Sequence, residues 1–451
     1  MTRGLAAVVG GSVAGLLAAR VLSSSFERVL VFERDDLRRT GARKGVPQAN
    51  HVHVLLGAGA AVIERLFPGL FEAVARAGGR YVDMSQYNNW FHFGVWKRRF
   101  ESGVGGYAQS RLLLEAQLRE HVLALPNVEL RCQSVEGLAW PSERPQLSLG
   151  SERLDVDFLV DASGRASKLP QQLAAAGFDS LREDSIVVDV TYTSARYTSV
   201  KRDWMGLLVY PEPPAGRRAG AALPIETGEV VVSLFGWCGE RAGHDDDAFR
   251  AFAASLPQPE IAEFLSQATR VGDFHQYKYR EARLRHFEQC RLPARTIALG
   301  DALCSVDPVF GQGMTVAALS AEILEGCLAE AVEDPASLFW ERIPAAYRTA
   351  WELSTTEDFR YPQVTGRRPF GIGVAHWYTA HVHRLAASDD DVYRRFARVM
   401  HLLRPPAHLF HPSVVRKVLA SALGVGSRAP SSRPRAPEAP SKHSPEDLLA
   451  R

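Results

Sequence analysis

The sequence contains few cysteines and has almost no net charge. Each of these features excludes a class of protein. The five cysteines are odd in number and never spaced as Cys-x-x-Cys. They therefore indicate neither a disulfide framework nor a metal site, and they suit a reducing cytoplasm. The formal net charge is only +2, and no basic stripe interleaved with aromatic residues occurs. A nucleic-acid partner is therefore not expected.

Long apolar runs are missing as well. No stretch of about 18 apolar residues is available to span a bilayer. The chain does not open with a charged segment followed by an apolar run, as a signal peptide would. We therefore expect a cytoplasmic protein. What the sequence does have is length and apolar content, since 451 residues, 46 % of them apolar, suffice for two closely packed domains and a tail.

The beginning of the chain carries a strand–turn–helix–strand pattern. An apolar run over residues 5–9 leads into Gly10-Gly11-Ser12-Val13-Ala14-Gly15, and a helical pattern follows over 16–22. A second apolar run over 29–32 ends in Glu33-Arg34. This order of elements is typical of a nucleotide-binding βαβ unit.

The residues of this pattern suit a dinucleotide. Gly10 permits a tight turn, Gly15 lets helix and strand pack closely, and free N–H groups at the helix start can face a pyrophosphate. Glu33 lies 18 residues after Gly15, near the spacing of about twenty for an acid that accepts a ribose hydroxyl. Ser12 replaces the usual middle glycine, but its side chain is small. The alternative is a glycine-rich turn in some other α/β domain.

Two later segments combine a buried strand with a polar turn. A strand over 158–160 ends in Asp161-Ala162-Ser163-Gly164, and a strand over 296–299 runs into Gly300-Asp301. Asp301 would end a buried strand, where a carboxylate is costly unless it accepts hydrogen bonds. Pro308 and Gly311-Gln312-Gly313 then precede the longest predicted helix, over 315–332. The free N–H groups and positive end of that helix can stabilise a negative charge.

Together with the glycine turn, these segments resemble the class A flavin-dependent monooxygenases, the para-hydroxybenzoate hydroxylase-like family, over roughly residues 5–330. Within that class, Arg43-Lys44-Gly45-Val46-Pro47-Gln48-Ala49-Asn50-His51-Val52-His53 is similar to the corresponding stretch of polyether-type polyene epoxidases. The sequence departs from the family at Cys304, where many relatives have a histidine. The role of that histidine therefore does not carry over.

The resemblance implies FAD as cofactor and NADPH or NADH as co-substrate. It implies that Pro308 lies over the isoalloxazine ring and that Asp161 belongs to a segment serving both FAD and the nicotinamide pyrophosphate. Arg43 and Arg111 match positions that hold FAD phosphate or ribose, with solvated arginines as the alternative. The residues expected to contact the cofactor are Gly10, Ser12, Val13, Ala14, Gly15, Glu33, Arg34, Arg43, Arg111, Asp161, Gly164, Asp301, Pro308, Gly311, Gln312, Gly313 and Met314.

Two histidines invite a metal interpretation, which we do not favour. His51 and His53 are separated by one residue, a spacing that suits a strand or turn better than a helical metal site. No third ligand is close in the sequence. We expect a loop packed beside the cofactor, and no metal.

The expected fold is α/β, with a Rossmann-type FAD-binding domain interleaved with a mostly antiparallel β-sheet substrate domain and followed by a helical C-terminal region. We assign residues 1–80, 105–180 and 290–335 to the first, 81–104 and 181–289 to the second, and 336–425 to the third. Residues 426–451, rich in Pro, Ser and Arg, are expected to be a disordered tail. Predicted strands include 128–138, 146–154, 186–192, 205–210, 220–225 and 229–236, and predicted helices include 340–351, 393–402 and 413–423.

Aromatic residues gather between positions 88 and 100, where a strand pair could line an apolar cavity, although core packing explains them equally well. The expected substrate-pocket residues are Trp90, Phe91, Phe93, Trp96, Tyr192 and Tyr210. The last two predicted helices are basic and amphipathic and could rest peripherally on a membrane surface. Their packing on the catalytic body is the favoured alternative.

The resemblance implies that NAD(P)H reduces FAD, that reduced FAD adds O₂ to form a hydroperoxide, and that its distal oxygen passes to an electron-rich alkene or arene. No catalytic protein residue is assigned, because this transfer needs no protein nucleophile. We expect a lipophilic small-molecule substrate such as a polyketide or a prenylated aromatic. A flavin-dependent halogenase would show a Trp-x-Trp-x-Ile-Pro segment and a catalytic lysine, and neither is recognised. A geranylgeranyl-reductase-like enzyme and a non-redox flavoprotein cyclase also fit the same three segments.

Overall fold

The computed structural model describes residues 3–36, 47–198, 200–330 and 332–424, so Arg43 and the predicted tail lie outside the described residues. A five-stranded parallel sheet in the order β17-β11-β1-β2-β7 forms one layer. Both faces of β1 are apolar and fully buried, with Ala6 and Val8 on one side and Ala7 on the other. The strands are β1 (Arg3–Val9), β2 (Phe26–Glu33), β7 (Val128–Cys132), β11 (Phe158–Asp161) and β17 (Thr296–Ala298).

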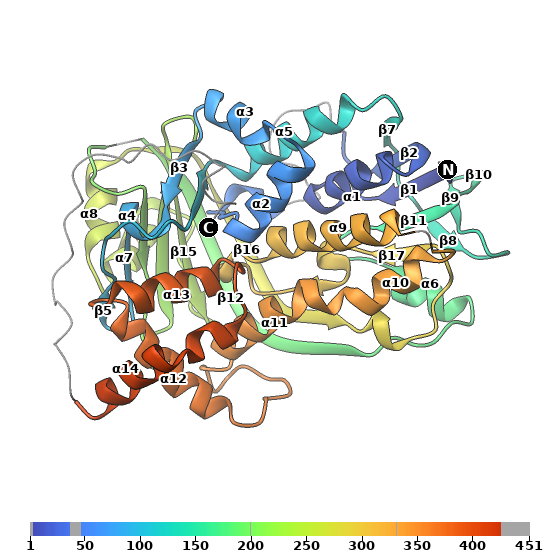
Figure 1. Ribbon diagram of the computed structural model, residues 1–451. Coiled ribbons are helices and arrows are strands. Elements are labelled where there is room, and N and C mark those ends of the chain that lie inside the picture. Colours follow the sequence, from blue (N-terminus) through green and yellow to red (C-terminus); the bar gives the residue numbers. More distant parts are fainter. Residues whose placement is uncertain (1–2, 37–46, 199, 331, 425–451) are drawn as a thin grey trace.

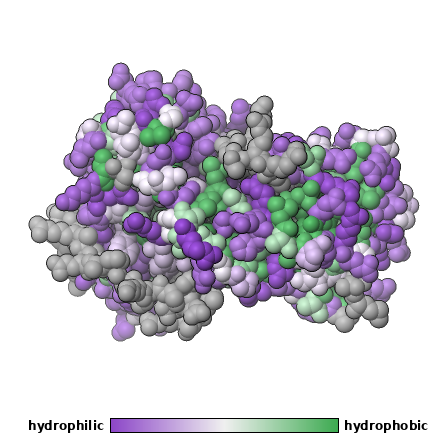
Figure 2. Space-filling view, turned by 90° about the horizontal axis from the view of Figure 1, so that it is seen from above, coloured by the Kyte–Doolittle hydropathy of each residue, from purple (hydrophilic) through white to green (hydrophobic). Residues whose placement is uncertain are grey.

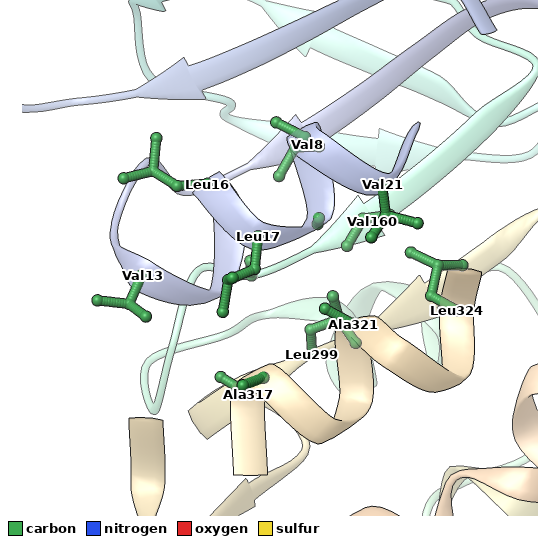
Figure 3. Close-up of a cluster of buried hydrophobic side chains, with 14 of the residues drawn as sticks. Val8, Val13, Leu16, Leu17, Val21, Val160, Leu299, Ala317, Ala321 and Leu324 are labelled. Carbon is green, nitrogen blue, oxygen red and sulfur yellow. The ribbon is translucent and has the colours of Figure 1, made fainter. Parts of the chain in front are cut away.

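Helices pack on one face of this sheet, and a small antiparallel sheet packs on the other. Figure 3 shows α1 (Val13–Ser23) against α9 (Gly313–Ala329), where Leu17 lies over the small residues Ala317 and Ala321. These alanines let the two helices approach closely. Both helices begin at the same edge of the sheet. The neighbouring elements are α2 (Gly57–Leu66), α3 (Leu70–Arg76), α5 (Arg111–Leu123), α6 (Leu169–Ala175), β8 (Gly137–Ala139), β9 (Gln146–Leu149) and β10 (Glu152–Asp155).

Two predicted strands in this region are wrong as single strands. The stretch 128–138 divides into β7, in the parallel sheet, and β8, in the three-stranded sheet. The stretch 146–154 folds into a hairpin of β9 and β10, with Gly150 at φ +66° in the turn. Apolar alternation predicted strands in both places, but it did not reveal where the chain leaves one sheet for another.

An eight-stranded sheet in the order β18-β16-β12-β15-β14-β13-β4-β5 forms the second large layer (Figure 1). All neighbours are antiparallel except β13 and β4. Its outer face is covered by α7 (Asp246–Ala254) and α8 (Glu260–Gln267), which bury Phe249 and Phe264 against it. The strands are β4 (Asn88–His92), β5 (Val95–Trp96), β12 (Glu183–Tyr197), β13 (Gly206–Val209), β14 (Arg218–Pro224), β15 (Val230–Trp237), β16 (Arg270–Arg285) and β18 (Cys304–Ser305).

The strand β16 was not predicted, although it is the longest in the sheet. Its sequence is mostly polar and charged, so it lacks the apolar alternation that marked its neighbours. It is nevertheless held along its length by β12, with partners from Glu183↔Arg285 to Tyr197↔Arg270. Pairing with an established strand therefore overrides the weak local pattern.

The C-terminal helices cover the face of the second sheet that lies opposite α7 and α8 (Figure 1). The single helix predicted over 340–351 is wrong, because the chain forms two helices that divide at Ile343 and Pro344. A further helix, α12, lies where none was predicted. The helices are α10 (Pro335–Arg342), α11 (Pro344–Asp358), α12 (Ile372–Leu385), α13 (Asp390–Met400) and α14 (Pro412–Ala422).

The apolar faces of α13 and α14 are buried against the rest of the molecule. Phe396, Val414 and Val418 share one cluster with Trp90 of β4. Within the described residues, no helix is both long and apolar enough to cross a bilayer. The face seen from above is mostly hydrophilic, with hydrophobic residues gathered toward its middle (Figure 2). The parallel sheet, the antiparallel sheet and the C-terminal helices together confirm the predicted α/β fold class.

Candidate functional site

Three segments singled out in the sequence meet at one edge of the parallel sheet. The strands β1, β11 and β17 are neighbours, and each of the three polar turns follows the carboxyl end of one of them. The Ala162 N–H donates to the Val9 carbonyl at 2.8 Å, and the Leu299 N–H donates to the Asp161 carbonyl at 2.9 Å. The carboxyl edge of a parallel sheet is where α/β folds bind nucleotides.

The first turn requires glycine at two positions. A Cβ on Gly10, whose φ is +105°, would lie 2.4 Å from the Ala162 carbonyl oxygen, so the glycine turn and the Asp161 segment touch through backbone alone. A Cβ on Gly15 would lie only 1.8 Å from the Gly10 carbonyl oxygen. Ser12 tolerates the middle position because its hydroxyl points to α5, donating to Glu115 at 2.9 Å and accepting from Arg111 at 3.1 Å.

The two acids predicted on the first two strands hold the loops that follow them. Glu33 accepts hydrogen bonds from the Gly11 N–H at 2.9 Å and the Asp35 N–H at 3.1 Å, and it also lines the cavity described below. Asp161 is buried and accepts from the Ser163 N–H at 2.9 Å and from the hydroxyls of Ser163 and Ser167. Its carboxylate thereby fixes the shape of the Asp161-Ala162-Ser163-Gly164 turn.

Asp301 differs from those acids because no protein donor reaches its carboxylate within the described part of the chain. It follows β17 in the short helix η3 (Gly300–Ala302) and lines the cavity. Burial raises the pKa of the Asp301 carboxyl, although the guanidinium groups of Arg165 and Arg111 act to lower it. A carboxylate that lines the cavity in this way can accept a hydrogen bond from a ligand.

The N-terminus of α9 carries further polar atoms without protein partners. Gln312 caps this helix and is fully buried, yet both its amide oxygen and its amide nitrogen lack a hydrogen-bond partner in the described residues. The Thr315 hydroxyl, one turn further, also lacks a partner there, but it lies against Gly59 of α2 and does not line the cavity. Gly313 begins the helix, so its free N–H groups and positive end face the cavity. These groups fit the hydroxyls and the electron-rich edge of a flavin dinucleotide.

A single cavity of about 980 Å³ connects these groups to the second sheet. Of the residues predicted to contact the cofactor, Gly15 is buried behind the turn and Arg43 lies outside the described residues. All the others line the cavity, namely Gly10, Ser12, Val13, Ala14, Glu33, Arg34, Arg111, Asp161, Gly164, Asp301, Pro308, Gly311, Gln312, Gly313 and Met314. The structure thus brings segments from the whole first three quarters of the chain to one site.

The expected substrate-pocket residues divide into two groups. Trp90, Tyr192 and Tyr210 line the cavity. Phe91 and Trp96 do not, because successive residues of a strand face opposite sides and these two pack into the outer cluster beneath α7 and α8.

Phe93 is also absent from the cavity wall. It turns away from the sheet with φ +55° and lies between the ring of His383, 4.6 Å from it, and the guanidinium of Arg360, 4.7 Å from it. These three aromatic residues belong to the core, which was the alternative that the sequence left open.

His51 and His53 both line the cavity as neutral side chains. Burial lowers the pKa of His51 to about 4 and that of His53 to about 3. His51 Nδ1 lies 2.7 Å from the Ser194 hydroxyl, and His53 Nδ1 donates to the His51 carbonyl at 2.8 Å. No group of potential metal ligands occurs among the residues that the structure describes.

Several cavity residues escaped the sequence analysis. Tyr277 and Tyr279 lie on the unpredicted strand β16, and their spacing of two was the only signal that both face one side. Others come from elements with no local motif. The most prominent are Phe235, Trp237, Asp358, Tyr361 and His383.

No family model matches the chain. Protein Rv3254 of Mycobacterium tuberculosis is 32% identical over 351 residues, which cover 72% of each chain. The flavin-dependent brominase Bmp2 matches with a TM-score of 0.66 at 15% identity, over 93% of this chain and 98% of its own. The p-nitrophenol 4-monooxygenase PnpA of Pseudomonas putida DLL-E4 matches with a TM-score of 0.62 at 17% identity, over 89% and 99%. At these identities the structural likeness shows the fold, which is that of flavin-dependent enzymes.

Proposed function

The chain belongs to the same family as protein Rv3254 of Mycobacterium tuberculosis, and from that premise we propose that it is an FAD-dependent monooxygenase. In this proposal it uses NADPH or NADH and O₂ to insert one oxygen atom into a lipophilic metabolite, such as a polyketide or a prenylated aromatic. The insertion is an epoxidation or a ring hydroxylation, and polyether-type polyene epoxidases are the nearest functional model.

The observation that carries this proposal is the continuity of the cavity. One continuous space runs from the glycine turn and Asp301 to the aromatic face of the second sheet, at Trp90 and Tyr210. A dinucleotide at the first end and an apolar molecule at the second would therefore meet inside one chain. When bound, FAD supplies the reduced flavin that activates O₂ for transfer.

The protein groups around the cofactor end would bind and orient it. Glu33 and Asp301 both line the cavity, where Glu33 would accept a hydrogen bond from a ribose hydroxyl and Asp301 from a ribityl hydroxyl. Gln312 and the free N–H groups at the start of α9 would stabilise negative charge on the reduced flavin. The side-chain amide of Gln312 finds no protein partner among the described residues.

The substrate end favours apolar area over charge. Trp90, Leu208 and Phe235 line it, and burial of apolar ligand surface contributes roughly 25 cal/mol per Å². Apolar walls also keep water away from the reacting atoms. An electrophilic oxygen transfer under these conditions requires no protein nucleophile, which agrees with the absence of an assigned catalytic side chain.

Turnover assays with product mass detection test the proposal. The purified chain is supplied with FAD, NADPH or NADH, O₂ and candidate lipophilic alkenes or prenylated aromatics. We expect reductant consumption coupled to a product that is heavier by one oxygen atom. Efficient coupled oxidation with a small polar phenolic acid, and none with lipophilic substrates, would refute the proposed substrate class.

Halogenation is a second candidate because a buried lysine lies beside the substrate end. Lys97 is 1% exposed, its ammonium group donates to the carbonyls of His92 and His383, and it lies 5.7 Å from the centre of the Trp90 ring. Burial lowers the pKa of Lys97 well below its usual range. The same assay with bromide or chloride distinguishes the candidates, since a halogenated product that disappears in Lys97→Met would favour this one.

Reactant requirements separate alkene reduction and cyclisation from oxygen insertion. A geranylgeranyl-reductase-like enzyme would saturate alkenes with NAD(P)H and would not need O₂. A flavoprotein cyclase would form its product without consuming NAD(P)H. Anaerobic and reductant-free arms of the turnover assay therefore identify both.

A further inference from the structure

Two buried carboxyl groups meet at the substrate end of the cavity. Asp307 precedes the short helix η4 (Pro308–Phe310) and is fully buried, while Asp358 is the last residue of α11 and is 1% exposed. The two carboxyl groups lie close enough to interact electrostatically, although 50 residues lie between them in the chain. Asp358 lines the cavity, whereas Asp307 lies immediately behind Pro308.

A proton shared by these two carboxyls would relieve the repulsion between them. Asp307 Oδ2 and both oxygens of Asp358 are buried and find no well-aligned hydrogen-bond donor in the described residues. Two ionised carboxylates are acceptors only, so a hydrogen bond between them requires a proton on one of them. No arginine or lysine within the described residues forms an ion pair with either group. Burial raises the pKa of both carboxyls, that of Asp358 well above its usual range.

The groups facing the pair do not neutralise its remaining negative charge. Tyr192 hydrogen-bonds to Asp307, the Trp237 indole lies beside the same carboxyl, and the Ser354 hydroxyl lies beside Asp358. Glu357, the acidic neighbour of Asp358, is engaged with Arg360 at 2.6 Å. The other titratable neighbours are phenols with pKa values raised by burial, namely Tyr210, Tyr277, Tyr279 and Tyr361. With one proton between them, the two carboxyls would carry a single negative charge at this end of the cavity.

The contact with Asp307 determines which hydrogen bonds the Tyr192 hydroxyl can form with a ligand. The Tyr192 hydroxyl donates its single hydrogen to Asp307 Oδ1 at 2.7 Å, and Asp307 Oδ1 also accepts from the Val309 N–H at 3.0 Å. A phenol has one donor and two lone pairs, so only acceptor capacity is left on Tyr192. Its ring lines the cavity between Phe235, Tyr277 and His51.

We propose that Tyr192, held by the Asp307–Asp358 pair, accepts a hydrogen bond from a hydroxyl group of the substrate. The substrate class is then a neutral, lipophilic molecule that carries a phenolic, enolic or alcoholic hydroxyl. A carboxylate is disfavoured because it brings a second negative charge and offers no hydrogen. Asp307 and Asp358 act as positioning residues in this proposal, which rests on the proposed function only in taking the cavity as the substrate site.

Matched ligands test the acceptor role of Tyr192. Isothermal titration of the full chain, supplied with FAD, compares para-heptylphenol with para-heptylanisole and para-heptylbenzoate, which share one tail and differ in the polar group. We expect the phenol to bind about tenfold more tightly than the ether, the value of one buried hydrogen bond, and the benzoate to bind most weakly. Equal affinity of the phenol and the ether would overturn the proposal.

Single-residue variants identify the side chain responsible for the preference for phenol over ether. Tyr192→Phe should abolish the preference for phenol over ether, whereas Tyr210→Phe, at another tyrosine of the same cavity, should retain it. Asp307→Ala frees the Tyr192 hydrogen for the ether oxygen and should also abolish the preference. Asp307→Asn keeps an acceptor for Tyr192 and should preserve it, which guards against a mere folding defect. A preference that survives Tyr192→Phe would overturn the proposal.

Infrared spectroscopy tests the shared proton without any ligand. Wild-type protein at neutral pH should show the carbonyl stretch of a protonated carboxylic acid, and this band should disappear in Asp358→Asn. The band should persist in Asp245→Asn, which changes a helix-capping aspartate at the surface. Its absence from the wild type would overturn the positioning role of the pair. Flavin absorbance of the same samples reports on the proposed function separately, because the ligand preference is measurable whether or not FAD is retained.

Discussion

The substitution Gly15→Ala is a direct test of the glycine turn. The added methyl group would lie 1.8 Å from the Gly10 carbonyl oxygen and 2.8 Å from its carbon, both backbone atoms that cannot rotate away. Ordinary contact begins at 3.4 Å, so α1 must move away from the turn by more than an ångström. The start of α1, where the proposed pyrophosphate site lies, moves with it.

The expected change in the free energy of unfolding combines two opposing effects. Forcing a methyl group into a packed contact costs about 3 kcal/mol, at the upper end for such changes because the partner is backbone. Alanine in a helix offsets about 1 kcal/mol of this through its higher propensity. A net loss of about 2 kcal/mol lowers the melting temperature by about 2 °C in a chain of this size. We expect FAD affinity to fall about tenfold, which corresponds to about 1.4 kcal/mol.

Thermal unfolding followed by circular dichroism and FAD titration followed by fluorescence measure the two effects. The matched control is Gly326→Ala in α9, at an exposed position where an added Cβ meets nothing within 4 Å. This change should stabilise the protein by about 0.5 to 1 kcal/mol and leave FAD affinity unchanged. Gly15→Ala with wild-type melting temperature and wild-type FAD affinity would refute the close-approach argument.

Three further predictions concern the cofactor, acid stability and the membrane. The purified protein should be yellow with non-covalent FAD, and Asp301→Ala should lose most of it; unchanged affinity would show that the site is assigned incorrectly. Below pH 6.5 only the unfolded chain protonates the buried histidines, whose folded pKa values are about 4 for His51 and His401 and about 3 for His53. Stability should therefore fall by roughly 1.4 kcal/mol per histidine per pH unit between about pH 6.5 and pH 4, and equal denaturant midpoints at pH 7 and pH 5 would contradict this. Because the apolar faces of α13 and α14 are buried, we expect no co-sedimentation with anionic vesicles, and salt-sensitive binding would support the membrane contact instead.

The end of the cavity near the glycine turn was predictable because consecutive residues encode its shape. Gly10 and Gly15 are required by contacts within one turn and its adjoining helix. Asp301 and Gln312 follow a strand and precede a helix that apolar patterning had already identified. That these segments meet follows from strand adjacency in a nucleotide-binding fold, a rule that needs no knowledge of side-chain packing.

Strand faces and helix boundaries were less predictable. Trp90 reaches the cavity while its neighbour Phe91 faces the outer helices, and aromatic composition alone does not distinguish the two orientations. The polar strand β16 forms because β12 offers it a partner, and its own residues show little preference for a strand. The break between α10 and α11 depends on Pro344, which begins a second helix as readily as it ends the first.

The groups that would select the substrate could not be found in the sequence, for a physical reason. Tyr192, Asp307 and Asp358 come from β12, the turn before η4 and the end of α11, and no local pattern relates them. Each is ordinary on its own, since aspartates before a proline or at a helix end are usually solvated. Their chemistry arises only when folding removes water from all three and leaves two carboxyls to share a proton. In this proposal, ligand selection depends on tertiary contacts, and Asp307→Ala should change it without altering the glycine turn.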